Sequence, residues 1–178
     1  MQKESPNSYY IPAEDSIFLA NYIENQKGKS ALDIGTGSGI LATVLSKNFE
    51  FVVATDVNLL ALKKAHETVT NCICCNAADA LQTSFDLIVC NLPYLPSDEL
   101  LDSAVDGLRD GTEIPNMIIK SASSRIGKKG KMILLTSSFA NYDILIQLCE
   151  SLGFDVNIVA RKKLFYEELL LVECVRNT

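Results

Sequence analysis

The sequence lacks the features that mark a membrane, secreted or metal-binding protein. Its apolar runs, such as Leu169–Val172, are far too short to span a bilayer. The first residues, Met1–Tyr10, are polar and contain no apolar signal-peptide core. There is one histidine, His66, and the six cysteines do not form two pairs at zinc-finger spacing. We therefore expect a cytoplasmic protein with reduced cysteines and no metal site.

Basic residues are also scarce. Sixteen lysines and arginines face 22 aspartates and glutamates, which gives a net charge of −6. A protein that grips a nucleic-acid backbone needs a cationic surface, so direct nucleic-acid binding by this chain alone is not expected. Short basic turns at 128–131 and 161–163 are expected to face solvent, although either could touch ribosomal RNA. The length of 178 residues suits one domain over 1–178.

Short β-branched runs alternate with helical patterns along the chain. Strands are predicted at 31–34, 51–55, 72–76, 85–90 and 131–136, and helices at 14–25, 40–47, 59–68, 113–124 and 142–152. A long loop is expected from Asn91 to Gly111. The alternation predicts a parallel sheet with helices on both faces. The last two runs, 155–160 and 167–174, are too close for a crossover helix and predict an antiparallel hairpin. The expected fold is α/β, a Rossmann-like seven-stranded sheet whose last strand is antiparallel.

A glycine-rich turn follows the first predicted strand, and it reads Asp33-Ile34-Gly35-Thr36-Gly37-Ser38-Gly39. Such a turn brings backbone close to a ligand. Dinucleotide enzymes carry a related G-x-G-x-x-G, but here Gly39 follows Gly37 after one residue, and Asp33 lies two residues before Gly35. S-adenosylmethionine (SAM) has no pyrophosphate, and its ammonium group favours a carboxylate. The turn therefore predicts a SAM site in which Asp33 supplies the charge or orders water around the ammonium group.

Two more aspartates follow successive strands. Asp56 ends the second strand, where a carboxylate can accept both hydroxyls of a ribose. Asp79 follows the third strand and could accept the N6 protons of adenine. Singly, each is more often a solvated loop residue. Three acidic residues at the carboxyl edge of one sheet, where open α/β sheets bind ligands, favour a cofactor site.

The fourth strand ends in Asn91-Leu92-Pro93-Tyr94. Here the chain resembles the amino-methyltransferases with an Asn-Pro-Pro-Tyr motif and, more narrowly, the HemK-like release-factor glutamine methyltransferases of class I. Pro12–Ser16, Asp33–Gly39 and the ending 161–168 carry the same resemblance. The ending looks like that of the short archaeal and eukaryotic branch. Bacterial members carry an N-terminal helical domain and a different motif in place of Pro-Ala-Glu-Asp, so the chain is expected to resemble the short branch.

The resemblance implies roles for the site residues. Ser16 would bind the methionine carboxylate of SAM, Asp33 and Gly35 the methionine end, Asp56 the ribose and Asp79 the adenine. Asn91 would contact both the surroundings of the cofactor and the substrate amide. The Asn91 side-chain oxygen and the Leu92 carbonyl would accept the two N–H groups of the substrate amide, and Tyr94 would pack against that amide. Leu92 replaces the family's first motif proline, but as the residue before Pro93 it stays extended. The segment 106–111 departs from the family's glycine-rich pattern at Leu108 and Arg109.

The third strand in this fold usually forms the sheet edge, and here it reads Cys72-Ile73-Cys74-Cys75. A short, apolar, uncharged edge invites pairing with another chain. The resemblance to the short branch implies a small zinc-binding activator protein along this edge. The alternative is a strand that the chain's own loops cover.

Three functions are open to the sequence. The first is N5-methylation of a protein glutamine, in the Gly-Gly-Gln loop of a peptide-chain release factor. The second keeps the site but methylates an adenine N6 amine in DNA or RNA, which usually needs an added recognition domain or basic face. The third is a cofactor-binding scaffold without catalysis, against which Asn91 and Tyr94 argue. His66 lies in a crossover helix and is expected to be a surface or packing residue.

Overall fold

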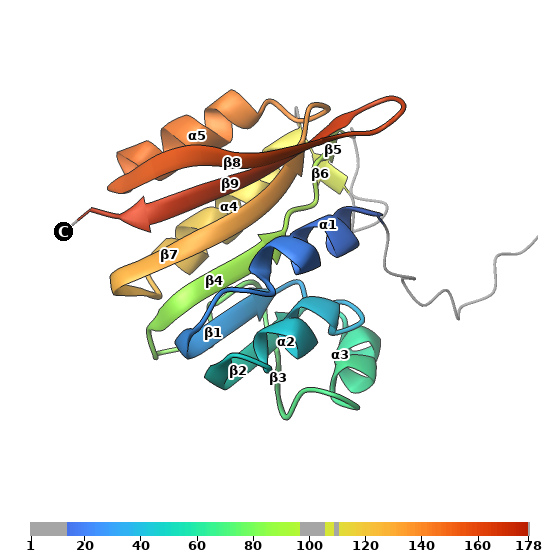
Figure 1. The fold of residues 1–178 in the computed structure, drawn as a ribbon, viewed down its shortest axis with the longest axis vertical. Coiled ribbons are helices and arrows are strands. Elements are labelled where there is room, and N and C mark those ends of the chain that lie inside the picture. The colour runs from blue at the N-terminus through green and yellow to red at the C-terminus, as the bar shows by residue number, and fades with distance from the viewer. Residues whose placement is uncertain (1–13, 97–105, 109–110, 178) are drawn as a thin grey trace, which may run out of the picture.

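One seven-stranded sheet organises the molecule (Figure 1). The computed structural model describes residues 14–96, 106–108 and 111–177. The strand order is β3-β2-β1-β4-β7-β9-β8, so β1 and β4 lie side by side in the middle. The strands of the sheet are β1 (Gly28–Ile34), β2 (Phe49–Asp56), β3 (Asn71–Cys74), β4 (Phe85–Asn91), β7 (Ile126–Ser137), β8 (Phe154–Lys163) and β9 (Glu168–Arg176).

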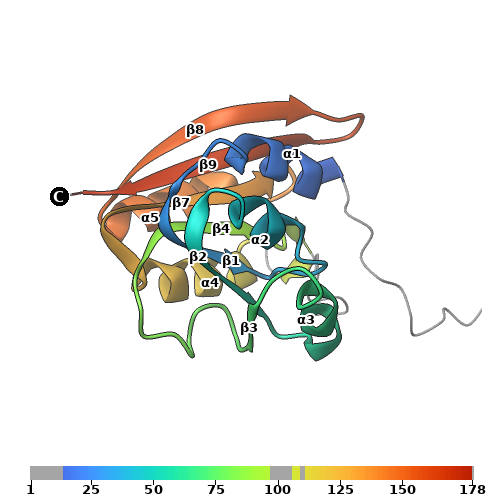
Figure 2. The ribbon, with the colours of Figure 1, turned by 60° about the horizontal axis from the view of Figure 1, so that its bottom comes forward.

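Helices cover both faces of the sheet, as predicted. They are α1 (Glu14–Ile23), α2 (Ile40–Leu45), α3 (Leu59–Ala65), α4 (Glu113–Ser123) and α5 (Tyr142–Ser151). Figures 1 and 2 show α1 and α2 on one face and α4 and α5 on the other. No helix in the described ranges is long and apolar enough to cross a membrane.

Alternate residues of the central strands belong to two hydrophobic clusters, one on each face of the sheet. In β4, Ile88 and Cys90 join the cluster beneath α4 and α5, while Leu87 and Val89 join the one beneath α1 and α2. All four side chains are at most 2% exposed. Because both faces are covered, these strands read as continuous apolar runs rather than as alternating ones. The burial on both faces fixes the register and so the position of Asn91 at the end of β4.

The C-terminal hairpin is confirmed. Strand β9 runs antiparallel to both β7 and β8, so it alone reverses direction within the sheet. Strand β3 is an edge strand, also as predicted, and β8 forms the opposite edge.

The prediction of a plain loop between Asn91 and Gly111 was wrong in one respect. Strands β5 (Leu95–Pro96) and β6 (Asp106–Leu108) pair there as a small separate sheet. Strands of two and three residues give no readable period, which is why the sequence did not reveal them. The Arg109 departure falls outside the described residues, as do Pro12 and Ala13 of the resemblance.

The observed ends of several elements differ from the predicted ones where glycines or short polar turns interrupt the apolar pattern of the sequence. Strand β7 begins at Ile126 rather than Lys131, because Ile126 pairs with Phe85 of β4. The glycines and lysines at 127–130, which read as a loop, form an irregularity before the ladder resumes at Lys131. The helices predicted to reach residues 47 and 68 end at Leu45 and Ala65. Tight turns complete both segments, with Asn48 N donating to Leu45 O and Thr68 N to Ala65 O.

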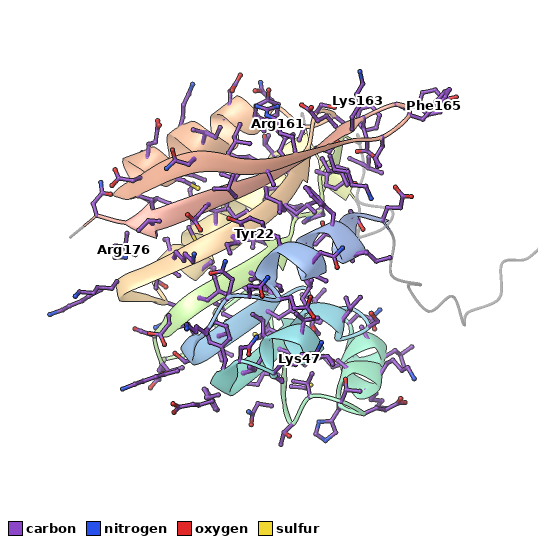
Figure 3. The ribbon with its side chains drawn as sticks, viewed as in Figure 1. Tyr22, Lys47, Arg161, Lys163, Phe165 and Arg176 are labelled. Carbon is purple, nitrogen blue, oxygen red and sulfur yellow. The ribbon has the colours of Figure 1, made fainter. Side chains whose placement is uncertain are left out.

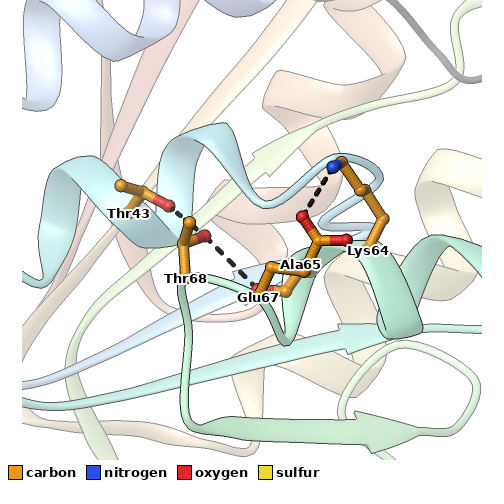
Figure 4. A network of polar contacts seen from close by, with 5 residues as sticks. All are labelled: Thr43, Lys64, Ala65, Glu67 and Thr68. Carbon is orange, nitrogen blue, oxygen red and sulfur yellow. Dashed lines mark hydrogen bonds and ion pairs between the residues drawn. The ribbon is translucent and has the colours of Figure 1, made fainter.

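A close backbone approach joins α2 to α3. Gly39, just before α2, has φ +84°, and a Cβ built there would lie 2.9 Å from Ala65 Cα. Figure 4 shows the polar contacts around this junction: Thr43 Oγ1 lies 2.9 Å from Thr68 Oγ1, and Thr68 Oγ1 donates to Ala65 O. Gly39 is thus required for two reasons, its backbone conformation and the room that Ala65 leaves.

We predict that Gly39→Ala lowers the free energy of unfolding by about 2–4 kcal/mol, from left-handed strain plus the clash with α3. The matched control is Gly153→Ala, because Gly153 has φ +83° but no atom within 4 Å of its built Cβ. The control should lose only about 1–2 kcal/mol. Urea unfolding measures both, and equal losses would show that the Ala65 contact costs nothing.

Candidate functional site

The predicted site residues come together at the carboxyl edge of β3, β2, β1 and β4. Asp33 lies near the end of β1, Asp56 ends β2, Asp79 follows β3, and Asn91 ends β4. These four strands are neighbours in the sheet, in the spatial order β3-β2-β1-β4. The parallel arrangement therefore puts the acidic residues and the Asn91 motif on one edge, where α/β sheets bind their ligands.

The glycine turn lies against β2 and opens toward solvent. The backbone N–H groups of Gly35 and Thr36 donate to Thr55 O at 2.8 and 3.0 Å. Gly35 and Gly37 have φ +68° and +52°, and no atom lies within 4 Å of a Cβ built on either. The turn is held in place from below and leaves open space above its backbone, which is the shape of a ligand cradle.

Asp33 is fully buried beneath this turn. Its Oδ2 accepts hydrogen bonds from Thr36 Oγ1 at 2.6 Å and from Ala42 N at 3.0 Å. Its Oδ1 is buried and accepts no hydrogen bond from any described residue. Burial, the largest effect, raises the pKa of the Asp33 carboxyl to about 7; the two hydrogen bonds lower it and nearby Asp56 raises it. An incompletely paired carboxylate of this kind favours a cation or a proton.

Asp56 connects the glycine turn to the start of α3. Its Oδ2 accepts from Gly37 N at 2.9 Å and its Oδ1 from Asn58 N at 2.8 Å. Asn58 in turn caps α3 by accepting from Leu60 N and Ala61 N. The Asp56 side chain is half-buried, and each carboxylate oxygen has a second acceptor position, so it can still bind a ligand hydroxyl.

Asp79 is exposed and belongs to a small polar cluster with α4. Its Oδ1 accepts from Ser121 Oγ at 2.5 Å, and its Oδ2 accepts from Asn76 Nδ2 at 3.2 Å. Ser121 Oγ also accepts from Ala78 N at 3.1 Å. The segment between β3 and β4 contains no helix, and this cluster fastens it to α4 instead.

Helix α1 meets the end of β4 through Ser16 and Asn91. Asn91 Nδ2 donates to the buried Ser16 Oγ at 3.3 Å, although the two residues are 75 positions apart in sequence. Asn91 Oδ1 is buried and accepts no hydrogen bond from the part of the chain that the structure describes. An acceptor oriented by one partner, with its own oxygen unsatisfied, can receive an N–H from a substrate.

Leu92 makes a contact that proline could not. Its backbone N–H donates to Leu135 O at 3.0 Å, which extends the pairing of β4 with β7 by one residue. Its side chain is 2% exposed. Replacement of the family's proline by leucine therefore adds a backbone hydrogen bond at this position.

Gly111 borders the motif and was not among the predicted site residues. A Cβ built on it would lie 2.2 Å from Tyr94 O, and its φ is +66°. Pro93 is buried, and Tyr94 is half-buried against the cluster beneath α1. Gly111 thus allows the chain that returns from β6 to pass directly against the Asn91–Tyr94 motif.

Sequence reasoning also missed Thr36 and Ser121, which hold Asp33 and Asp79. Thr36 lies inside the glycine turn, where a hydroxyl three residues after an aspartate is a readable signal. Ser121 carries no signal, because its contact with Asp79 arises only from folding.

The residues fit a cofactor with a cationic amine and hydroxyl groups. Asp33 offers an unsatisfied carboxylate oxygen, the turn offers open backbone, and Asp56 offers acceptor oxygens. Nothing in this set suits a metal ion: among residues 14–96, 106–108 and 111–177, no group of three His, Cys, Asp or Glu side chains could hold one.

Known proteins are similar to this chain in sequence and in fold. A protein of Methanocaldococcus jannaschii, provisionally named a protein N5-glutamine methyltransferase, is 36% identical over 180 residues, which cover 94% of this chain and 91% of that protein. The release factor glutamine methyltransferase of Bradyrhizobium diazoefficiens is 32% identical over 123 residues, covering 57% of this chain and 41% of the relative. This chain therefore spans less than half of that bacterial protein.

The fold agrees with a solved structure as well. The E. cuniculi Mtq2–Trm112 complex, described as responsible for methylation of the eRF1 translation termination factor, contains a chain with a TM-score of 0.82 and 26% identity. The match covers 95% of this chain and 99% of that one. The methyltransferase small domain model matches residues 13–167. The chain therefore belongs to the methyltransferase small domain family and is a SAM-dependent methyltransferase.

Proposed function

We propose that this protein methylates the side-chain amide nitrogen of a glutamine in another protein, and that its target is the Gly-Gly-Gln loop of a peptide-chain release factor. The buried, unsatisfied Asn91 Oδ1 at the end of β4 carries the proposal, because an amide NH₂ group is the partner that it lacks. The similarity to a protein named a glutamine methyltransferase over almost the whole chain supports the same substrate class.

The cofactor residues have assigned roles in this proposal. Asp33 and the backbone of Gly35, Gly37 and Gly39 hold the methionine end of SAM, and Ser16 binds its carboxylate. Asp56 binds the ribose hydroxyls and Asp79 the adenine. When bound, SAM supplies an electrophilic methyl group on a sulfonium.

The chain's own contribution is to orient a weak nucleophile. Delocalisation into the carbonyl makes an amide nitrogen poorly nucleophilic. Asn91 Oδ1 and the Leu92 carbonyl oxygen each accept one N–H, which fixes the nitrogen and points its lone pair at the methyl group. Tyr94 packs against the flat amide and helps to exclude water, and Pro93 keeps Leu92 extended. Methyl transfer would leave S-adenosylhomocysteine and an excess proton on a strongly acidic nitrogen, which would be lost readily, so no strongly basic residue is required.

A small activator protein is the proposed partner. Strand β3 ends the sheet, with Ile73 half-buried and Cys74 exposed, and nearby Leu59 and Leu60 are 56% and 67% exposed. Such an edge can accept a strand from another chain. The structural relative is itself a complex with Trm112. That the activator binds zinc is part of the proposal, as is a cytoplasmic location, with which six free thiols agree.

The first test is methyl transfer from labelled SAM to a purified release factor, with and without the activator. A factor whose Gly-Gly-Gln glutamine is replaced is the matched control. Label on the normal factor only establishes the reaction, and a fully active, soluble monomer without the activator contradicts the partner. No label, with SAM binding intact, would favour an adenine amine or another substrate.

Asn91→Ala should lower the rate of methyl transfer by about 10²–10³-fold, because it removes the acceptor that orients the amide. SAM affinity should fall less, by under about tenfold, since Asn91 donates to Ser16, which keeps its own hydroxyl for the cofactor in the variant. Single-turnover kinetics and SAM titration measure the two effects. Unchanged transfer would support the scaffold function; loss of both in parallel would make Asn91 a cofactor residue only.

Asp33 should make the stability of the cofactor-free protein depend on pH. Its pKa is raised to about 7 in the fold. The folded state therefore binds one more proton than the unfolded state between about pH 4 and pH 7, and that stabilisation is lost as the pH rises through 7. The free energy of unfolding should fall between pH 5.5 and pH 8, which cover the upper part of this window, and Asp33→Asn should reduce the fall by roughly 1–3 kcal/mol. Urea unfolding at both pH values checks this, and identical falls in the two proteins would contradict a raised pKa.

A further inference from the structure

Two aromatic side chains stand exposed at the end of the C-terminal hairpin. Phe165 and Tyr166 are 89% and 83% exposed, in a turn between β8 and β9. We refer to residues 164–167 as the aromatic turn. Figure 3 shows Phe165 at the outer tip of the hairpin, beyond the sheet. Neither ring belongs to a hydrophobic cluster of the described core, so folding does not explain their presence.

The aromatic turn is closed by a backbone hydrogen bond and by a contact between its two rings. Leu164 N donates to Glu167 O at 2.8 Å, and Lys163 pairs with Glu168 in the ladder directly below. The two rings meet edge to face, with centroids 4.7 Å apart and an interplanar angle of 75°. Aromatic side chains have only two side-chain torsions and so lose little conformational entropy for the area that they bury, which suits them to a protein interface.

The turn lies on the same edge of the sheet as Asn91. Glu167 Oε2 accepts from Ser137 Oγ, at the end of β7, at 2.5 Å. Lys162 Nζ lies 3.4 Å from Glu14 Oε2, in the first turn of α1, the helix that also carries Ser16. Ser16 contacts Asn91 at 3.3 Å. The hairpin, α1 and the Asn91 motif are therefore one continuous border of the site.

The charges beside the turn favour a protein over a nucleic acid. Arg161 is paired with Glu168 at 2.6 Å and Lys162 with Glu14, which leaves Lys163 without an ion pair among the described residues. Glu167 adds a further carboxylate. Three cations and three carboxylates thus balance, whereas a phosphate backbone would need an excess of cations. Between Ser138 and residues 163–168 lies an open hollow of about 360 Å³, which gives a partner side chain room beside the rings.

We infer that the aromatic turn docks the folded body of the protein substrate, outside the loop that presents the glutamine. This rests on the proposed function, and it assigns substrate recognition to Phe165 and Tyr166 rather than to the residues that orient the amide. Aromatic side chains are enriched among the residues that dominate protein interfaces. The turn is at the β8 edge and the proposed activator at the β3 edge, so both partners fit at once.

The test compares two substrates with the double variant Phe165→Ala/Tyr166→Ala, assayed with the activator present. For the intact release factor, kcat/KM should fall about 10–100-fold, mainly through KM. For a short peptide carrying the Gly-Gly-Gln sequence, it should not change. Val175→Ala is the control, because Val175 is 36% exposed near the end of β9, away from the catalytic edge and from the β3 edge, and should leave both substrates unaffected.

Direct binding of the intact factor, measured by calorimetry with S-adenosylhomocysteine present, provides a readout without turnover. The double variant should bind at least tenfold more weakly, with an unchanged thermal midpoint, because the rings are exposed. Wild-type affinity for the factor in the variant overturns the inference. The inference is also overturned if the double variant loses kcat/KM equally on the peptide and on the intact factor. It is overturned as well if the variant loses only RNA binding or changes only in self-association.

If wild-type protein methylates neither substrate, the proposed function fails. The binding comparison then still decides the inference. If the release factor binds neither the wild-type protein nor the double variant, or binds the two equally well, the inference is overturned.

Discussion

The candidate site depends on the buried carboxylate of Asp33, which connects strand β1 to the glycine turn and to helix α2. One of its oxygens holds Thr36 in the glycine turn and Ala42 in α2, so a single side chain of β1 fixes both the turn and the helix that follows it. The backbone of the turn is in addition bonded to Thr55 of β2. Because these contacts use one carboxylate oxygen and leave the other unsatisfied, the same residue that shapes the cradle also gives it an incompletely paired carboxyl group that favours a cation or a proton.

The Asn91 motif depends on long-range contacts of a different kind. Asn91 is oriented by Ser16 from α1, Leu92 is bonded to Leu135 of β7, and Tyr94 lies against Gly111. Three separate segments thus converge on four consecutive residues. Rigid placement of this sort is what catalysis by orientation requires, since a shift of about 1 Å in such a group can lower a rate by two orders of magnitude.

Much of this architecture could be predicted from the sequence, for identifiable reasons. Strands buried on both faces, such as β1 and β4, leave apolar runs, and the glycine turn, Asp56 and Asn91 follow them directly, so strand order alone places them on one edge. The short span between β8 and β9 required an antiparallel hairpin.

The features that escaped prediction depend on folding. The two-residue β5 has no period, the extension of β7 passes through glycines and lysines, and the contact of Ser121 with Asp79 joins residues 42 positions apart. Leu92 is the clearest case. In the sequence, Leu92 is seen only as the replacement of the family's proline. In the fold, its backbone N–H forms a hydrogen bond with Leu135 of the neighbouring strand β7. The single-domain assignment and the individual site roles remain predictions.

The strand order also divides the molecule in a way that bears on how such enzymes diversify. Everything on the β3, β2 and β1 side comes from residues before β4, and β7, β9 and β8 come from residues after it, so the chain crosses the middle of the sheet once. The two halves are nevertheless joined by side-chain contacts, because Ser121 of α4 donates to Asp79, and Lys162 of β8 pairs with Glu14 of α1. A junction near the end of β4 would therefore join halves of different enzymes only where both halves keep the residues that make these contacts.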